Sequence, residues 1–488
     1  MSILVIDLGS SSTRAMLFDA QADLIPAAVV RQSSQFNADN EDDPRAAVDR
    51  VNDVLAEITS KFKQPITDIG LSCYATSLIG LDENHEPMTA VMTYADARPA
   101  EDARVLRLKF DEMDALQRTG CRIRSTYWPA KLTWLKRTQP DTFVRIRWFC
   151  SLADYVCWRV FGTFHTGISV ASWTGLINRQ TNDWDETWLR ALNVQLEQLP
   201  AIAQQPATVK QGSWQGAQLH PPLGDGAAAN IGSGCTDPSR VAVTIGTTAA
   251  LRIVVETGKG KETTDDGRRT TAGSLSSVVR RLSSPLPSSL WEYRVDQTHA
   301  LIGGATTEGG SVFAWAQRAL KLGDEDAIER AVAQQKPDQH GLTVLPMFAG
   351  ERSPGYAEDV RATLHGLSLD TSPEEMVRAL LEAVAFRLAM IHDSLREVAE
   401  PGAVLVGSGG ALVGSPTWCQ IIADVTNAPL SLSAEAEASA KGVALLVASQ
   451  HITKQSLSTS RIFQPDLERH KIYRAAMQRQ QELYDKLV

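Results

Sequence analysis

The sequence has few cysteines, and they stand apart from one another. It has 6 among 488 residues, none of them in a CxxC pair, and its 9 histidines form no HxxxH pair. Spacings of that kind are typical of structural zinc sites and disulfide-rich domains. The pattern therefore predicts free thiols in a reducing compartment and argues against a fold held by zinc or by disulfides.

Long apolar runs and an excess of positive charge are also missing. No uninterrupted apolar stretch approaches the roughly 20 residues that a membrane-spanning helix needs. No cationic segment precedes an apolar core near Met1, so the first residues are expected to form a strand and not a signal peptide. The formal net charge of −9 argues against a broad nucleic-acid-binding surface. We therefore expect a cytoplasmic protein without nucleic-acid or membrane partners.

What the chain does contain is one pattern that occurs twice, about half a chain apart. Residues 3–19 (ILVIDLGSSSTRAMLFD) and 241–255 (VAVTIGTTAALRIVV) each show an apolar run, a turn of Gly and hydroxyl residues, and a second apolar run. This order is typical of a β-hairpin with a polar tip. At 488 residues the chain is too long for one typical core, so two or more domains are expected.

The atoms of such a tip suit a polyphosphate. Glycine lets the backbone approach a ligand closely, and amide and hydroxyl donors can surround anionic oxygens. Asp7 stands beside the first tip, and a carboxylate there suits a hydrated Mg²⁺. Two tips that face each other would hold a polyphosphate between two lobes. The alternative is two ordinary hairpins with polar turns, which are common singly and less expected as a pair.

Strands alternate with helices along most of the chain, which favours parallel or mixed α/β sheets. The expected strands are 66–73, 300–305, 342–346 and 403–406, and the expected helices are 44–61, 101–120, 128–138, 152–161, 183–192, 312–320, 372–397, 416–426 and 466–488. Residues 169–175 are expected to form a turn, and most tryptophans to pack in the core. The loop-rich stretch 201–237 is the candidate domain boundary. Residues 257–289 are expected to form a mobile surface excursion without chemistry.

Nine segments, in order, resemble the FGGY family of carbohydrate kinases, which belongs to the actin-like ATPase superfold. They are DLGSSSTR, KLTWLK, VASWTG, GDGAAANIGSG, VTIGTT, GGATTEGGSVFAW, AGERSPGY, GLSLDTSPEEMVRALLEAV and GSGGALVGSPTWCQIIADV, and together they span essentially the whole chain. The resemblance implies an α/β fold of two ribonuclease-H-like domains around a central cleft. Residues 1–240 would form the sugar-binding domain and residues 241–488 the nucleotide-binding domain.

The resemblance also implies ATP and Mg²⁺ as cofactors and assigns residues to them. The residues assigned to ATP are Ser10, Ser11 and Arg14 at the γ-phosphate, Gly246, Thr247 and Gly310 at the phosphates, and Gly410, Ala411 and Gly414 at the adenosine. Asp7 would lie near Mg²⁺, and the sugar would lie near Ala75, Thr76 and Asp96.

Asp225 matches the family's catalytic aspartate. A carboxylate in that role accepts the proton of the sugar hydroxyl as its oxygen attacks the γ-phosphorus. The alternative is that Asp225 caps the Ala-rich helix expected from Ala227, and the two roles are compatible. Asp237 is the rival carboxylate, but Pro238 after it is typical of a turn.

Within the family, the gluconate-kinase branch is the most similar, through SLIGLDENHEPMT, WRVFGTFHTGISVASWTGL, DWDE and AGERSPGY. The sequence departs from that branch at Tyr74-Ala75-Thr76, Tyr94 and Gly167, near the expected sugar pocket. The leading hypothesis is phosphorylation of D-gluconate to 6-phosphogluconate, with Lys131 and Arg98 as candidate partners of the carboxylate. The alternatives are a xylulokinase or ribulokinase type of ketopentose kinase, a sugar-binding regulator, and a nucleotide-driven conformational switch without kinase activity. The resemblance suggests a homodimer.

Overall fold

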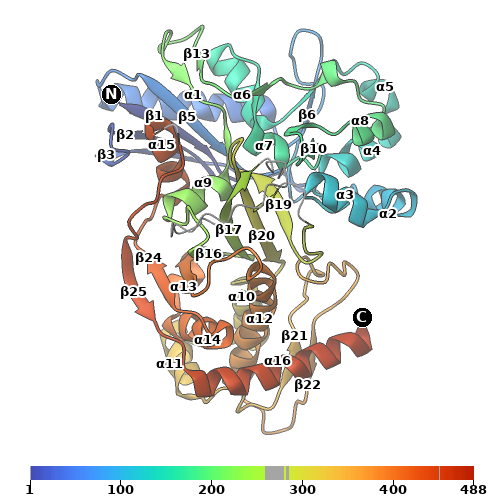
Figure 1. The fold of residues 1–488 in the computed structure, drawn as a ribbon, viewed down its shortest axis with the longest axis vertical. Helices are drawn as coiled ribbons and strands as arrows, with labels where there is room; N and C mark the ends of the chain where they lie inside the picture. Colours follow the sequence, from blue (N-terminus) through green and yellow to red (C-terminus); the bar gives the residue numbers. More distant parts are fainter. Residues whose placement is uncertain (1, 259–279, 282–284, 450) are drawn as a thin grey trace, which may run out of the picture.

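Two mixed β-sheets form the centres of two lobes that lie one above the other along the long axis of the molecule (Figure 1). The computed structural model describes residues 2–258, 280–281, 285–449 and 451–488. The first sheet has the order β13-β14-β5-β1-β2-β3, with β15 paired to β5. Its strands are β1 (Ile3–Leu8), β2 (Ser12–Phe18), β3 (Leu24–Ser33), β5 (Asp68–Cys73), β13 (Ala207–Thr208), β14 (Gln218–Leu219) and β15 (Leu223–Gly224).

The second sheet repeats the topology of the first. Its order is β19-β20-β17-β16-β23-β24-β25, with β18 (Arg280–Arg281) paired to β17. Its other strands are β16 (Arg240–Ile245), β17 (Ala249–Gly258), β19 (Trp291–Arg294), β20 (His299–Thr306), β23 (Val404–Ser408), β24 (Leu430–Ser433) and β25 (Thr459–Phe463). In each sheet an antiparallel three-strand unit is followed by two parallel strands. The two predicted hairpins are therefore β1–β2 and β16–β17, in equivalent positions.

Strand β1 is apolar throughout because both of its faces are covered. Leu4 and Ile6 join the core beneath the first sheet, whereas Ile3 and Val5 pack on the other face against the helix α15 (Ala438–Ser449). A strand buried on both faces is expected to lack the usual apolar–polar alternation. Figure 1 shows α15, near the C-terminal end of the sequence, beside the strands of the first sheet. The C-terminal half of the chain thus completes the core of the N-terminal lobe.

Helix α15 crosses α9 (Asp225–Gly232) at backbone contact. A Cβ on Gly442 would lie 1.8 Å from the carbonyl oxygen of Ala228, and a Cβ on Gly232 would lie 1.8 Å from that of Ala438. Since real side-chain atoms cannot approach a carbonyl oxygen so closely, only glycine fits at both positions. The crossing fixes the start of α9 relative to the second half of the chain.

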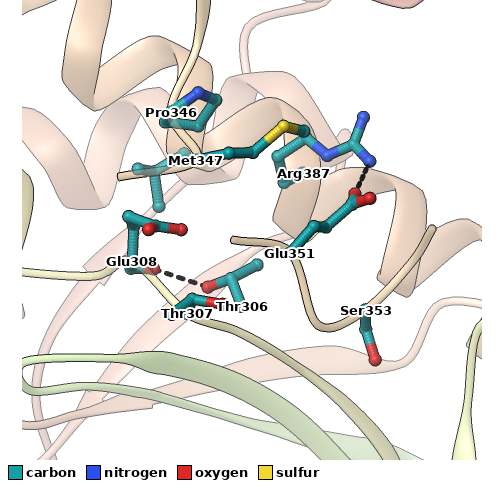
Figure 2. Close-up of a pocket in the computed structure, with 9 residues that line it drawn as sticks. Thr306, Thr307, Glu308, Pro346, Met347, Glu351, Ser353 and Arg387 are labelled. Atoms are coloured by element: carbon teal, nitrogen blue, oxygen red, sulfur yellow. Dashed lines mark hydrogen bonds and ion pairs between the residues drawn. The ribbon is translucent and has the colours of Figure 1, made fainter. Parts of the chain in front are cut away.

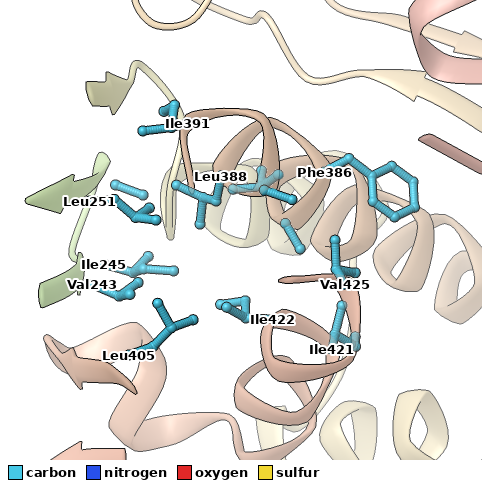
Figure 3. Packing of buried hydrophobic residues seen from close by; sticks show 14 of the residues in the cluster. Val243, Ile245, Leu251, Phe386, Leu388, Ile391, Leu405, Ile421, Ile422 and Val425 are labelled. Atoms are coloured by element: carbon cyan, nitrogen blue, oxygen red, sulfur yellow. The ribbon is translucent and has the colours of Figure 1, made fainter. Parts of the chain in front are cut away.

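The long helix α12 (Pro373–Leu395) organises the core of the second lobe (Figure 3). Its start was predicted from the sequence: the Ser372 hydroxyl accepts the Glu375 N–H, and the Glu375 carboxylate accepts the Ser372 N–H. Leu388 and Ile391 face Val243 and Leu251 of the sheet. Helix α14 (Pro416–Thr426) packs on the same core.

Most other predicted helices occur close to their expected bounds. These are α1 (Pro44–Lys61), α4 (Trp128–Thr138), α6 (Leu152–Phe161), α10 (Ser311–Ala319) and α16 (Leu467–Leu487). The helix expected over 101–120 is wrong as one element, since it breaks into α2 (Ala100–Lys109) and α3 (Glu112–Thr119). Asp111 causes the break, because its carboxylate accepts the N–H groups of Met113 and Asp114 and so caps a new helix.

Three smaller expectations have other outcomes. The turn expected at 169–175 forms only at 173–175, because the short helix α7 (Ile168–Ser172) covers the first residues. The helix expected over 183–192 begins later, as α8 (Glu186–Leu192). Most of the excursion expected at 257–289 lies outside the described residues. Among the residues that the structure describes, no helix combines the length and apolarity needed to cross a membrane.

The glycine crossing predicts a strong effect of one methyl group. Gly442→Ala should lower the free energy of unfolding by about 2 kcal/mol or more, because α9 and α15 must separate to admit the Cβ. Urea denaturation followed by circular dichroism measures the change. Gly323→Ala is the matched control, since a Cβ at Gly323 meets nothing within 4 Å. Equal midpoints for the two variants would contradict the argument.

Candidate active site

Asp225 is the first residue of α9, directly after β15. Gly224 holds the cap position and makes no side-chain cap hydrogen bond, so the alternative in which Asp225 caps the helix is wrong. The Asp225 carboxylate accepts only the neighbouring Gly226 N–H in the described part of the chain, at 2.7 Å. The Trp173 ring packs on this turn, and a Cβ at Gly224 or Gly226 would lie 2.9 or 2.8 Å from ring atoms. Glycine on both sides of Asp225 therefore lets the indole cover the turn.

Burial sets the electrostatics of Asp225. The loss of solvent raises its pKa to about 6, the charge of Asp7 adds to the effect, and Arg252 opposes it. A carboxylate with a pKa in this range remains ionised at neutral pH and holds a transferred proton better than an ordinary aspartate. Partial burial acts to raise the pKa of Asp237, but hydrogen bonds from Ser239 and Lys454 lower it below its usual value. Electrostatics therefore favour Asp225 as the base.

Asp7 and Arg14 lie opposite each other on the β1–β2 hairpin, and their side chains form an ion pair. Asp7 is 2% exposed and also accepts the hydroxyl of Ser72. Arg14 forms a second ion pair with Glu437, in the segment before α15. The sequence predicted Arg14 at a γ-phosphate, and the structure places it between two carboxylates. At the tip itself Ser10 is half-buried and Ser11 exposed.

Three segments meet at the tip of the second hairpin. Gly310 N donates to the Gly246 carbonyl at 2.7 Å, and Ser311 N donates to the Thr247 carbonyl at 3.2 Å. A Cβ on Gly310 would lie 3.3 Å from the Cβ of Ala411. The predicted nucleotide-binding residues of the three segments thus converge in space.

Around this meeting point the glycines leave room for a ligand. A Cβ placed on Gly246, Gly410 or Gly414 would meet nothing within 4 Å. Gly246 and Thr247 are exposed, and Gly410 opens the short helix α13 (Gly410–Gly414). Exposed backbone without side-chain bulk, beside open space, lets a ligand approach closely, so the segments fit ATP.

A small cavity lies behind the turn after β20, and its lining residues support that turn (Figure 2). Its volume of about 10 Å³ admits no more than about one water molecule, so it is not a substrate site. Burial raises the pKa of Glu308 in its wall to about 7, and the carboxylate accepts the Ala349 N–H at 2.9 Å. An ion pair between Glu351 and Arg387 forms the other side. These contacts hold the turn that leads into Gly310.

The predicted sugar residues lie after β5. Thr76 has a positive φ of 58°, which is uncommon outside glycine, and the fully buried Lys131 stabilises this backbone. Lys131 Nζ donates to the carbonyls of Thr76 at 2.6 Å and Met92 at 3.2 Å. Burial lowers the pKa of Lys131 to about 7. The contacts give Lys131 the role of a support beneath the loop.

Asp96 and Arg98 bind each other. Asp96 is 1% exposed and accepts Arg98 Nε at 2.9 Å and a terminal guanidinium nitrogen at 2.6 Å. Arg98 also pairs with Glu41 and lies over the Trp134 ring at 4.5 Å. Both cations that the sequence offered for a substrate carboxylate, Lys131 and Arg98, therefore already have partners.

Sequence reasoning missed an aromatic wall and one arginine. Trp173 stacks on Tyr293 with 4.6 Å between ring centroids, Trp291 stacks on the other side of Tyr293 at 4.4 Å, and the hydroxyls of Tyr127 and Tyr293 are hydrogen-bonded. Ala75 packs against the same cluster, which brings it toward the Asp225 turn. Arg252, in β17, lies beside that turn. Its sequence signal was a lone charge within the apolar run LRIVV.

A larger groove of about 210 Å³ lies elsewhere, between the two lobes. Its lining includes Pro221, Leu223, Gln297 and Val443 but none of the residues predicted for sugar, nucleotide or metal. The convergence of polar groups, and not the size of the hollow, therefore defines the candidate active site.

Comparison with known proteins agrees with this geometry. Residues 2–220 match the model of the N-terminal domain of the FGGY family of carbohydrate kinases, and residues 241–451 match that of its C-terminal domain. The chain belongs to the FGGY family of carbohydrate kinases. The resemblance deduced from the sequence is thereby confirmed.

Individual relatives of this FGGY kinase carry different substrate names. A gluconokinase from Bacillus licheniformis is 26% identical over 471 residues, covering 91% of this chain and 86% of the relative. A glycerol kinase from Gloeobacter violaceus is 28% identical over 454 residues, covering 91% and 87%. The solved structure of a ligand-bound xylulose kinase from Lactobacillus acidophilus has a TM-score of 0.85 at 24% identity, covering 100% and 98%. The last of these shows the fold.

The fold is the predicted pair of ribonuclease-H-like, actin-like ATPase domains, and the chain is an ATP-dependent sugar kinase. It is therefore an enzyme of the phosphotransferase class, acting on small-molecule sugars. No comparison tests the individual site residues, whose roles stay predictions.

The raised pKa of Asp225 predicts a pH dependence. If this carboxylate is the base, kcat/KM should fall roughly tenfold per pH unit well below about 6, as the group becomes protonated, and level off above. Initial rates with coupled ADP detection between pH 4.5 and 8 measure the profile. Asp237→Asn should leave it unchanged, because the pKa of Asp237 lies lower. A rate that stays constant down to pH 4.5 would exclude Asp225 as the titrating base.

Proposed function

We propose that this FGGY kinase phosphorylates D-gluconate to 6-phosphogluconate with ATP and Mg²⁺. The observation that carries the proposal is the position of Asp225, a half-buried carboxylate with a raised pKa at the start of α9, beside the aromatic wall and near Asp7. A sugar acid is favoured by the gluconokinase relatives and by the sequence segments shared with that branch.

In this proposal Asp225, the glycine turns and Asp7 each have a separate role in phosphoryl transfer. Asp225 accepts the proton of the substrate's 6-hydroxyl as the oxygen attacks the γ-phosphorus. The open space beside Gly246, Gly410 and Gly414 would admit the nucleotide, and the hydrogen bonds that Gly246 N and Gly310 N donate within the protein hold these turns in place. Asp7 would hold a hydrated Mg²⁺, which supplies positive charge to the phosphates when bound. Both Asp7 oxygens already accept hydrogen bonds, which favours contact through water.

Recognition of the gluconate carboxylate needs a cation or several donors. Lys131 and Arg98 are bonded within the protein, so we assign Lys131 to shaping the loop at Thr76 and Arg98 to holding Asp96. Arg352 is exposed and lies close enough to lower the pKa values of Arg252 and Tyr293 through its charge. It is the better candidate for the substrate carboxylate.

A ketopentose remains the second candidate. The run Tyr74-Ala75-Thr76 departs from the run usual in both gluconate and xylulose kinases at the expected sugar pocket, so it leaves the choice of sugar open. Membership of a kinase family favours catalysis over a nucleotide-driven switch or a sugar-binding regulator. A homodimer, suggested by family resemblance alone, stays a prediction.

The substrate assignment predicts an order of rates. With Mg–ATP, kcat/KM for D-gluconate should exceed that for xylulose, ribulose and glycerol by about tenfold or more, the discrimination expected from one well-made polar contact. Coupled ADP detection on this panel measures it. ATP consumption without an acceptor should be at least about a hundredfold slower, since water is then the sole acceptor. A faster ketopentose or glycerol would overturn the gluconate assignment, and acceptor-independent turnover would overturn the kinase mechanism.

The two carboxylates of the inter-domain region can be separated by substitution. Asp225→Asn keeps the size of the side chain but cannot accept a proton, so kcat should fall about 10²–10⁴-fold with binding of both substrates retained. Asp237→Asn should cost less than about threefold, because its partners are Ser239 and Lys454. Both variants are measured in the same coupled assay. The reverse pattern would mean that Asp237 is the base.

A further inference from the structure

Strand β17 places Arg252 on the face that meets the first lobe. Leu251, Ile253 and Val255 alternate into the core of the second lobe, each at most 1% exposed. Val254 points to the other face, where it packs in the cluster that contains Trp173. Because side chains alternate along a strand, Arg252 lies on that same face, toward α9.

The guanidinium of Arg252 reaches the Asp225 turn. Its Nε lies 3.4 Å from the position of a Cβ on Gly226, and another nitrogen donates to the Thr244 hydroxyl at 3.3 Å. The Nε atom is buried and, within the part of the chain that the structure describes, has no hydrogen-bond partner. In the same part of the chain no carboxylate lies within 4.0 Å of this guanidinium.

Arg252 therefore carries a positive charge that no neighbouring carboxylate of the described residues neutralises. Burial lowers the pKa of Arg252 from its usual value, and the charge of Asp225 raises it again, so the two groups interact without forming an ion pair. Arg252 is half-buried with a buried Nε, and a cation so shielded from water without a paired anion is unfavourable for the folded state. Its presence on the wall of an active site indicates an anion that arrives with the substrates.

The proposed reaction brings two anions to this site, the polyphosphate and the substrate carboxylate. Thr244 stands two residues before Gly246, so Arg252 lies between the phosphate-binding tip and Asp225. The base must reach the attacking hydroxyl within hydrogen-bond distance, and in gluconate that hydroxyl is at the opposite end from the carboxylate. The position therefore favours the phosphate.

We propose that Arg252 is a further catalytic residue, which contacts the phosphoryl group of ATP during its transfer. The proposal rests on the kinase function proposed above. The substrate oxygen forms a bond to the γ-phosphorus, the bond to the β–γ bridging oxygen breaks, ADP leaves with that oxygen, and Asp225 takes the hydroxyl proton. The planar fork of Arg252 donates to the equatorial oxygens of the phosphoryl group, where negative charge is greatest.

The test compares two nucleotides on the same variant. Arg252→Met keeps much of the side-chain length and removes the charge. Isothermal titration with Mg²⁺ should show the β,γ-imido analogue of ATP binding about tenfold or more weakly, and ADP changing by less than about threefold, since only the analogue carries a γ-phosphate. The kcat for gluconate should fall about 10³-fold or more. Arg330→Met, an exposed arginine on α11 (Glu325–Gln334), is the matched control and should change neither affinity.

Three results would overturn the proposal: unchanged analogue binding, an equal loss of ADP binding, or weakened gluconate binding without nucleotide, which would assign Arg252 to the carboxylate. Arg252→Lys guards against misfolding of the methionine variant, because it keeps the charge and loses the fork. Its analogue affinity should lie between those of wild type and Arg252→Met, and a value equal to that of wild type would also contradict the role. The nucleotide titrations need no turnover. Failure of the gluconate assignment would therefore leave them interpretable.

Discussion

The backbone contact between α9 and α15 is the constraint on which the active site depends. The two helices approach until Gly232 and Gly442 face carbonyl oxygens of the partner helix. Helix α9 begins with Asp225, and the segment before α15 carries Glu437, which binds Arg14 on the first hairpin. One crossing thus sets the position of the proposed base and ties the first hairpin to the second half of the chain.

A second contact between the lobes forms on β19. Tyr293 stacks between Trp173 of the first lobe and Trp291 of its own strand, and Glu292 forms a buried ion pair with Arg179 at 2.6 Å. A buried pair of this kind adds little net stability, but it is strongly destabilising to break, so it favours one docked arrangement. Because Trp173 also covers the Asp225 turn, the same stack sets the distance between Asp225 and the strands of the second lobe.

Local patterns predicted what local forces determine. The hairpins, the helix at 44–61 and the capping box at Ser372 follow from apolar periodicity and from side chains that satisfy backbone groups nearby. The break at Asp111 depended on a competing cap within an otherwise helical pattern. The α9–α15 crossing joins residues about 200 positions apart. The residues next to Gly232 and Gly442 in the sequence give no signal that predicts this contact.

In the candidate site, too, some features were predictable from local sequence and others depend on distant segments of the chain. The glycine tips were predictable as hairpin turns because local residues determine them, whereas the partners of Lys131 and Arg98 depend on distant chain segments. Asp225 was identified through family resemblance, because the local sequence GDG before an Ala-rich helix does not distinguish a catalytic aspartate from a helix cap. Arg252 had a local signal, one charge in the run LRIVV, but its meaning required knowing which face of β17 meets α9.

Arg14 on the first hairpin and Arg252 on the second differ in their charge environment. Arg14 is neutralised by Asp7 and Glu437, whereas Arg252 has no paired carboxylate among the residues that the structure describes. An ion pair between Arg252 and Asp225 would satisfy both groups, but it would lower the pKa of the carboxyl and occupy the guanidinium. Their separation keeps the Asp225 pKa raised and the Arg252 donors available. A base and an anion-binding cation can act side by side only if they do not bind each other first, and the rigid contacts between the lobes maintain that spacing.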